Sequence, residues 1–139
     1  GDVMDDDLLN AMGDAAIGAV TAHIYSAAHP SQTNKDFVAA YKKAFGSRPG
    51  FMAVGGYDGI DLIYEALKKT GGKTDGDALV GAMKGMAWES PRGPISIDPD
   101  TRDIVQNVYI RKVEKTDGEL YNVEFQTFDA VKDPGKTKK

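Results

Sequence analysis

The segment from Gly50 to Gly72 constrains the fold more than any other part of this chain. Apolar side chains recur in it at the i, i+3, i+4, i+7 spacing of one helix face, and charged side chains occupy the opposite face. The apolar residues are Tyr57, Ile60, Ile63, Tyr64 and Leu67, and the charged ones are Asp61, Glu65, Lys68 and Lys69. The pattern predicts an amphipathic helix that ends at the glycine pair Gly71 and Gly72.

The front of this segment contains four glycines within ten residues, namely Gly50, Gly55, Gly56 and Gly59. Each glycine inside a helix costs about 1 kcal/mol relative to alanine. Their presence therefore needs another reason, and close approach of a second backbone or of a ligand is the usual one.

Composition excludes several classes of protein. The 139 residues fall within the size range of one domain, the net charge is -4, and the 17 basic residues are scattered except at the KTKK end. A nucleic-acid partner is not expected, because its binding needs basic residues on one face. The absence of cysteine excludes disulfides and thiolate chemistry. No apolar run approaches the roughly 18 residues of a membrane span, and no signal peptide is visible.

The first residue is Gly1, and the acidic run from Asp2 to Asp7 leads directly into an amphipathic segment. We expect a processed or truncated chain, with an expression scar as the alternative. The acidic run is typical of a helix N-terminus and predicts a short helix over 5–12. A calcium site is the less favoured interpretation, because the glycine-turned loop spacing is missing.

The first half of the chain is predicted to be mostly helical. A half-buried strand is expected near residues 19–25, where apolar and polar residues alternate. Helices follow, one capped by Thr33 or Asn34 and closed by Gly46, then the segment described above, then one capped by Thr74 or Asp75.

The second half changes to the two-residue period of strands. Trp88 to Pro94 is expected to be irregular because of its prolines. Alternating residues then predict strands at 95–97, 105–113 and 120–128, with turns at 98–103 and at Thr116, Asp117 and Gly118. Residues 129–139 are expected to form a flexible tail. A self-contained doubly wound domain would alternate strands and helices, so we expect this α/β chain to lack the sheet that its helices would cover.

Motifs for catalysis and for metal binding are weak. The sequence GGKT at 71–74 resembles a phosphate loop, but position 67 is a leucine within a helix where a glycine is needed. Asp98, Asp100 and Asp103 fit an acidic turn better than a calcium loop. His23 and His29 lack acidic neighbours at a ligand spacing, and no serine stands in a nucleophile elbow. We therefore expect no metal, no cofactor and no enzymatic activity.

Two tyrosines and a carboxylate remain as candidates for recognition. Tyr25 ends the predicted strand, and Tyr57 and Asp58 stand in the glycine-rich front of the helix. An aromatic ring and a carboxylate beside exposed backbone suit a small polar ligand. Core packing for Tyr57 and a solvated helix surface for Asp58 are the alternatives.

Several spaced segments together resemble one known family. They are Pro30 followed by FVAAYKKAFG at 37–46, GYDGIDLIYEAL at 56–67, SPRGPISIDPDTRD at 90–103 and YIRKVE at 109–114. This succession resembles the C-terminal part of periplasmic solute-binding proteins of the branched-chain amino acid ABC transporter family. The resemblance covers residues 5–128.

The resemblance implies a fragment of a two-lobed α/β fold, the type I periplasmic-binding-protein fold. It implies that residues 20–92 return to the first lobe and that residues 93–128 are strands crossing to the second. It also implies that the central helix starts near Phe51, with its first turn at the cleft between the lobes. Ligand-binding candidates are then Phe51, Met52, Tyr57 and Asp58, with Tyr25 near a hinge.

The implied function is a periplasmic receptor that delivers a small molecule, either an amino acid or an aromatic carboxylate, to ABC permease subunits. A ligand-sensing module of the same fold in a receptor or signalling protein is the alternative, and a small hydrolase is the least favoured. We expect that the fragment needs the missing N-terminal part of its own chain to bind ligand. Apolar faces around Phe37, Tyr41, Ile60, Ile63 and Leu79 would otherwise lack a partner, which predicts self-association.

Overall fold

The sheet of this protein is organised around one long strand, β4. The structure is a computed structural model and describes residues 2–136. Its helices and strands follow in the order α1 (Leu9–Met12), β1 (Val20–His23), α2 (Gln32–Phe45), α3 (Phe51–Lys69), α4 (Gly76–Met83), β2 (Ala87–Ser90), β3 (Gly93–Ile97), β4 (Ile104–Thr116) and β5 (Glu119–Val131). Short 3₁₀ turns occupy Asp2–Met4, Asp14–Ala16 and Pro134–Lys136.

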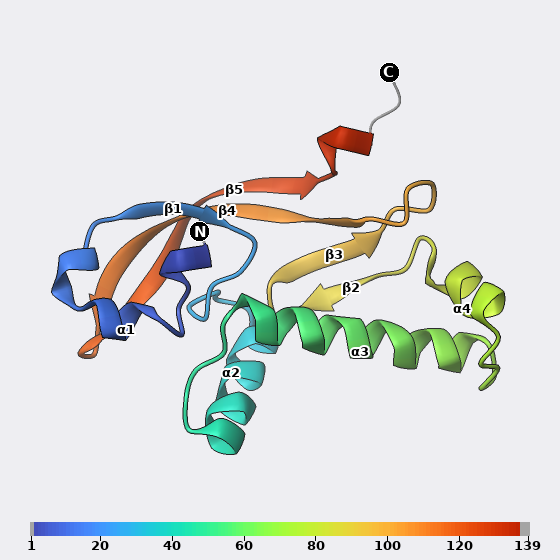
Figure 1. Cartoon of the computed structure of the whole chain (residues 1–139), viewed down its shortest axis with the longest axis horizontal. Helices are drawn as coiled ribbons and strands as arrows, with labels where there is room; N and C mark the ends of the chain where they lie inside the picture. Colours follow the sequence, from blue (N-terminus) through green and yellow to red (C-terminus); the bar gives the residue numbers. More distant parts are fainter. Residues whose placement is uncertain (1, 137–139) are drawn as a thin grey trace.

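All strand pairs in the described part of the chain are antiparallel, and β5 pairs with β4 along most of its length. The opposite edge of β4 is shared by two strands, β3 beside Ile104–Gln106 and β1 beside Tyr109–Lys112. β2 pairs with β3. Figure 1 shows α3 running alongside β2 and β3, with α2 next to its start and α4 next to its end. The predicted succession of helices followed by strands is confirmed.

Local capping chemistry sets most helix boundaries. Ser31, rather than Thr33 or Asn34, caps α2, because its side chain accepts the Asn34 N–H. Gly46 ends α2 in the left-handed conformation as predicted, with φ of 73°. Asp75 caps α4 through the Ala78 N–H. α3 begins at Phe51, as the family resemblance implied.

The helix predicted over 5–12 is shorter than expected, because only Leu9–Met12 is α-helical. The acidic residues before it do not form its first turn. Instead, the Asp5 carboxylate accepts the Phe51 N–H, and the Asp6 carboxylate accepts the Ala27 and Asn122 N–H groups. These side chains connect the N-terminal segment to the rest of the fold.

The prediction of irregular structure over 88–94 is wrong, because β2 and β3 form a hairpin there. Pro94 is the second residue of β3 and pairs with Glu89, whereas β3 meets β4 only from Ile95 onward. Its missing N–H therefore does not interrupt the ladder between β3 and β4. The two prolines mark the hairpin turn and the strand entry.

The hairpin between β4 and β5 turns at Asp117 and Gly118, whose φ angles are 51° and 85°. Positive φ at both residues is the signature of a two-residue type I′ turn, which confirms the predicted turn. Residues 129–131, expected to belong to the tail, continue β5 instead. Asn107 helps to hold them by accepting the Ala130 N–H. Residues 137–139 lie outside the described part of the chain.

The buried apolar core is small and lies at the α1 end of the sheet, where Leu9, Ala16, Val113 and Leu120 cluster. Apart from Leu9 of α1, the α-helices contribute no buried residue to this cluster. α2 fully buries Asn34 alone among its residues, and no residue of the described helix α4 is fully buried. Large apolar side chains stay exposed on the helices, namely Phe45, Met52, Tyr57, Ile60, Ile63, Tyr64 and Val80. Among the residues expected to lack a partner surface, Ile60 and Ile63 are exposed, whereas Phe37, Tyr41 and Leu79 are half-buried.

Candidate ligand-binding site

The N-terminus of α3 is capped by a residue far away in the sequence. Gly50 occupies the N-cap position and has no side chain for this purpose, so the Asp5 Oδ2 atom accepts the Phe51 N–H at 2.7 Å. A Cβ atom on Gly50 would overlap Asp5 Oδ2 and lie 3.0 Å from Asp7 Cγ. The close approach expected from the glycines is therefore real at Gly50, whereas added Cβ atoms at Gly55, Gly56 and Gly59 meet nothing within 4 Å.

A cavity of about 310 Å³ opens beside this helix start. Three parts of the chain surround it: the N-terminal segment, the end of α2 with the loop after it, and the first turn of α3. Its lining consists of Asp2, Asp5, Asp7, Leu8, Tyr41, Ser47, Arg48, Gly50, Phe51, Met52 and Ala53. Aromatic, aliphatic and charged groups thus line one cavity, and a small molecule with both apolar and polar parts could contact them.

Arg48 brings the one guanidinium among these lining residues, and it is only 6% exposed. Its Nε donates to the Asp6 carbonyl, and its guanidinium carbon lies 4.3 Å from the centroid of the Tyr121 ring. Within the described part of the chain, its Nη1 and Nη2 atoms are buried and have no hydrogen-bond partner. The cation–π contact holds the group in place.

Asp5 is the most deeply buried carboxylate of the lining, with 3% exposure. Burial raises its pKa above the usual value, and the neighbouring charges of Asp6 and Asp7 add to this, although the Phe51 N–H opposes it. Its second oxygen, Oδ1, has no partner among the residues that the structure describes.

Of the five residues predicted to bind ligand, Phe51 and Met52 line this cavity. The Phe51 ring contacts the His23 ring edge-on at 4.8 Å between centroids, and His23 Nε2 lies 3.0 Å from Asp2 Oδ1. Burial and the Arg111 charge lower the pKa of His23. Met52 is 75% exposed. The ring of Phe51 is thus fixed, whereas the Met52 side chain faces outward.

The other three predicted residues lie elsewhere. Tyr57 is 47% exposed, and its ring lies 5.0 Å from that of Phe37. Tyr25 is fully buried and donates its hydroxyl to Asn34 Oδ1 at 3.0 Å. Arg111 donates to the Tyr25 carbonyl. Tyr25 therefore lies in a polar network in the interior. Tyr57 of α3 contacts the row of aromatic rings that Phe37, Tyr41 and Phe45 form along α2.

Asp58 is buried and forms an ion pair with Arg92, whose Nη2 lies 2.6 Å from Asp58 Oδ2. Arg92 also donates from Nη1 to Gln106 Oε1 at 2.8 Å. Burial raises the pKa of Asp58 more than the hydrogen bonds from Ser90 and Arg92 lower it. The pair fastens α3 to the β2–β3 turn and to β4. A direct contact between Asp58 and a ligand stays a prediction.

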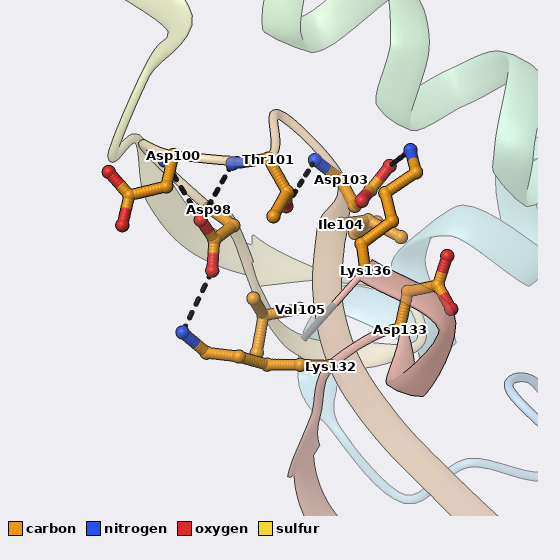
Figure 2. A pocket seen from close by; sticks show the side chains of 9 residues that line it. All are labelled: Asp98, Asp100, Thr101, Asp103, Ile104, Val105, Lys132, Asp133 and Lys136. Carbon is orange, nitrogen blue, oxygen red and sulfur yellow. Dashed lines mark hydrogen bonds and ion pairs between the residues drawn. The ribbon is translucent and has the colours of Figure 1, made fainter. Parts of the chain in front are cut away.

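A second cavity, of about 390 Å³, lies between the turn after β3 and the end of β5. Figure 2 shows that two of its carboxylates are paired with lysines, Asp98 with Lys132 and Asp103 with Lys136. Asp98 Oδ1 accepts the Asp100 and Thr101 N–H groups, and its Oδ2 accepts from Lys132 at 2.8 Å. Asp103 pairs with Lys136 at 2.7 Å. These residues form the predicted acidic turn, so the candidate site is placed at the start of α3.

Sequence reasoning missed Asp5 and Arg48 as lining residues. The acidic run was assigned to a helix start, and Arg48 was not singled out. The available signal for Arg48 was its position two residues before Gly50, the N-cap of α3, which places it close to the start of that helix. Within residues 2–136, no three or more His, Asp or Glu side chains are grouped so as to hold a metal ion. No described helix has both the length and the apolar character needed to cross a membrane.

The chain thus combines an antiparallel sheet, helices with exposed apolar side chains and a cavity at the start of α3. The sequence profile described as "periplasmic binding protein" matches residues 1–119. The chain belongs to this family, and the resemblance to its branched-chain amino acid transporter branch is confirmed.

Three relatives illustrate the similarity. A solute-binding protein of an ABC transporter from Rhodopseudomonas palustris BisB5, solved with 3,4-dihydroxybenzoic acid, is 83% identical with a TM-score of 0.97, over 99% of this chain and 38% of that one. One from R. palustris HaA2, solved with p-hydroxybenzoic acid, is 44% identical with a TM-score of 0.92, over 100% and 38%. Leu/Ile/Val-binding protein homolog 6 of Brucella abortus strain 2308 is 46% identical over 97% of this chain and 35% of its own length. The chain thus spans little more than a third of these relatives.

Proposed function

We propose that this chain is part of the extracytoplasmic substrate-binding component of an ABC importer, and that its ligand is a hydroxylated aromatic carboxylate. The observation that carries the proposal is the 83% identity and the TM-score of 0.97 to a protein solved with 3,4-dihydroxybenzoic acid. Two further relatives at 44% identity were solved with p-hydroxybenzoic acid and 4-hydroxybenzoate. The relative named for branched-chain amino acids, at 46% identity, is less similar than the first of these and about as similar as the other two.

The cavity at the start of α3 supports an aromatic ligand. Tyr41, Phe51 and Met52 contribute apolar lining, and Asp5 and Arg48 contribute hydrogen-bonding groups. A flat ring with polar substituents matches such a lining, because ring faces pack on aromatic and thioether groups while the substituents take the polar atoms. Phe51 and Met52 are the predicted residues to which we assign ligand contact.

The proposal includes a division between two lobes. Residues 20–92 would return to the first lobe, and residues 93–128 would cross to the second. The antiparallel pairing of Val20–His23 with Tyr109–Lys112 supports it, since two strands that connect the same lobes would run side by side. The exposed apolar faces of α2 and α3 would then be covered by the missing N-terminal part of the protein or, in the isolated chain, by another copy.

The proposed partners are ABC permease subunits, and the proposed compartment is the periplasm. The relatives' names describe binding and transport, which supports a non-enzymatic role and favours the importer over a sensing module.

A thermal-shift screen tests the proposal. The full coding sequence that contains these residues is expressed, and the protein is screened against amino acids and aromatic carboxylates. Dihydroxybenzoate and hydroxybenzoate are expected to raise the melting temperature, because a ligand that binds only the folded state stabilises it. A rise with leucine or valine and none with the aromatic acids would contradict the proposed ligand class.

A further inference from the structure

We infer that the cavity at the start of α3 receives the hydroxyl-bearing end of an aromatic acid, and that Asp5 Oδ1 accepts the hydrogen bond from the phenolic hydroxyl. This inference rests on the proposed function and deepens it by assigning the orientation of the ligand. The carboxylate of the ligand then points away from this cavity.

The charge of the cavity lining favours a hydroxyl group over a carboxylate. Asp2, Asp5 and Asp7 bring three carboxylates to the cavity, and Arg48 brings one guanidinium. The lining is therefore acidic as a whole. A ligand carboxylate is repelled there, whereas a hydroxyl group donates to a carboxylate and forms a strong, charge-assisted hydrogen bond.

One oxygen of the Asp5 carboxylate is paired within the protein, and the other is available to a ligand. Its Oδ2 atom accepts the Phe51 N–H and thereby caps α3. Its Oδ1 atom is buried and lacks a donor within the described residues 2–136. A carboxylate oxygen removed from water without a donor is costly, so a ligand that supplies the donor gains affinity.

Neighbouring groups hold both Asp5 and Phe51 in fixed positions. Contact with Gly50 and the hydrogen bond to Phe51 hold the Asp5 carboxylate, and the edge-on contact with His23 holds the Phe51 ring. An acceptor and an aromatic wall in fixed positions discriminate well between ligands, because neither has to be ordered when the ligand binds.

Arg48 offers the rival orientation. Its Nη1 and Nη2 atoms also lack partners within the described residues, and a ligand carboxylate bound to them would turn the molecule around. The guanidinium is held against Tyr121 and the Asp6 carbonyl. The two orientations predict opposite effects for substitutions at Asp5 and Arg48.

Calorimetric titration of the full-length protein with benzoate, 4-hydroxybenzoate and 3,4-dihydroxybenzoate separates them. Asp5→Asn keeps an oxygen for the Phe51 N–H, so the cap is retained. This variant is expected to weaken binding of the two hydroxylated ligands at least tenfold, and that of benzoate by less than threefold. Asp36→Asn, on exposed α2, is the matched control and is expected to change none of the three.

Equal weakening of all three ligands by Asp5→Asn overturns the inference, because it would reflect a structural role. A uniform loss of more than tenfold in Arg48→Met, with Asp5→Asn unaffected, overturns it in favour of the carboxylate at Arg48. If the wild-type protein binds none of the three compounds, the proposed function fails, and the inference fails with it.

Discussion

Arg92 and Asp58 form a buried ion pair between the β2–β3 turn and α3, with 2.6 Å between Nη2 and Oδ2. Both side chains are more than nine-tenths buried. Removal of one partner leaves a buried charge without its counter-charge, which is far more damaging than loss of a surface pair. The pair therefore anchors the helix whose first turn forms the candidate site.

We predict that Arg92→Met lowers the free energy of unfolding by about 3–5 kcal/mol, because Asp58 then stays buried and unpaired. The double variant Asp58→Leu with Arg92→Met is expected to recover much of this loss. Chemical denaturation measures both. Glu65→Gln, which removes the solvent-exposed pair with Lys68, is the control and should cost far less. Equal losses at the two pairs would contradict the anchoring role.

A separate prediction concerns ligand binding at Asp58. Asp58→Ala is expected to lower the ligand-induced thermal shift of the full-length protein. An unchanged shift would exclude Asp58 from ligand binding, whether by direct contact or through α3.

Two glycines of α3 are expected to respond in opposite ways to alanine. Gly50→Ala should destabilise the protein by about 1–3 kcal/mol, because its methyl group would overlap the Asp5 carboxylate. Gly56→Ala, where an added Cβ meets nothing within 4 Å, should stabilise the isolated chain by up to about 1 kcal/mol. Thermal or denaturant unfolding distinguishes them. A stabilising Gly50→Ala would mean that Asp5 does not cap α3 through close contact.

The contribution of Asp98 to the stability of the fold is expected to depend on pH. The hydrogen bond from Lys132 and the N–H groups of Thr101 and Asp100 lower its pKa from 3.8 to about 2. Because the folded-state pKa lies below the unfolded one, the stabilisation is present above pH 3.8 and is lost as the pH falls toward about 2. Denaturation of the wild type and of Asp98→Asn should therefore converge over this window. A difference that is constant from pH 5 to pH 2 would contradict this assignment.

The exposed helix faces predict self-association of the isolated 139-residue chain. Phe45, Ile60 and Tyr64 are each more than half exposed, and such a surface favours burial against another copy. Light scattering should show a dimer or a larger species. A compact monomer over a wide concentration range would contradict the prediction.

The elements that sequence predicted well are those set by neighbouring residues. The Gly46 stop, the Asp75 cap and the Asp117–Gly118 turn all depend on backbone conformation within a few positions. The β2 strand was missed, because the cost of Pro94 depends on where β3 meets β4, which local pattern does not reveal.

The candidate site was predicted only in part for the same reason. The family resemblance placed Phe51 and Met52 correctly at the start of α3, but the residues that complete the cavity come from elsewhere in the chain. Asp5 reaches Phe51 over 46 positions, and Arg92 reaches Asp58 over 34. Periodicity reports which face of a helix is apolar, and it carries no information on such distant pairings.

Isothermal titration calorimetry of the full-length protein with 3,4-dihydroxybenzoate, with leucine titrated in parallel, decides between the two ligand classes. Saturable binding of dihydroxybenzoate with one site per chain is expected, together with at least tenfold weaker binding of leucine. Saturable binding of leucine without binding of dihydroxybenzoate would contradict the proposed binding of a hydroxylated aromatic carboxylate.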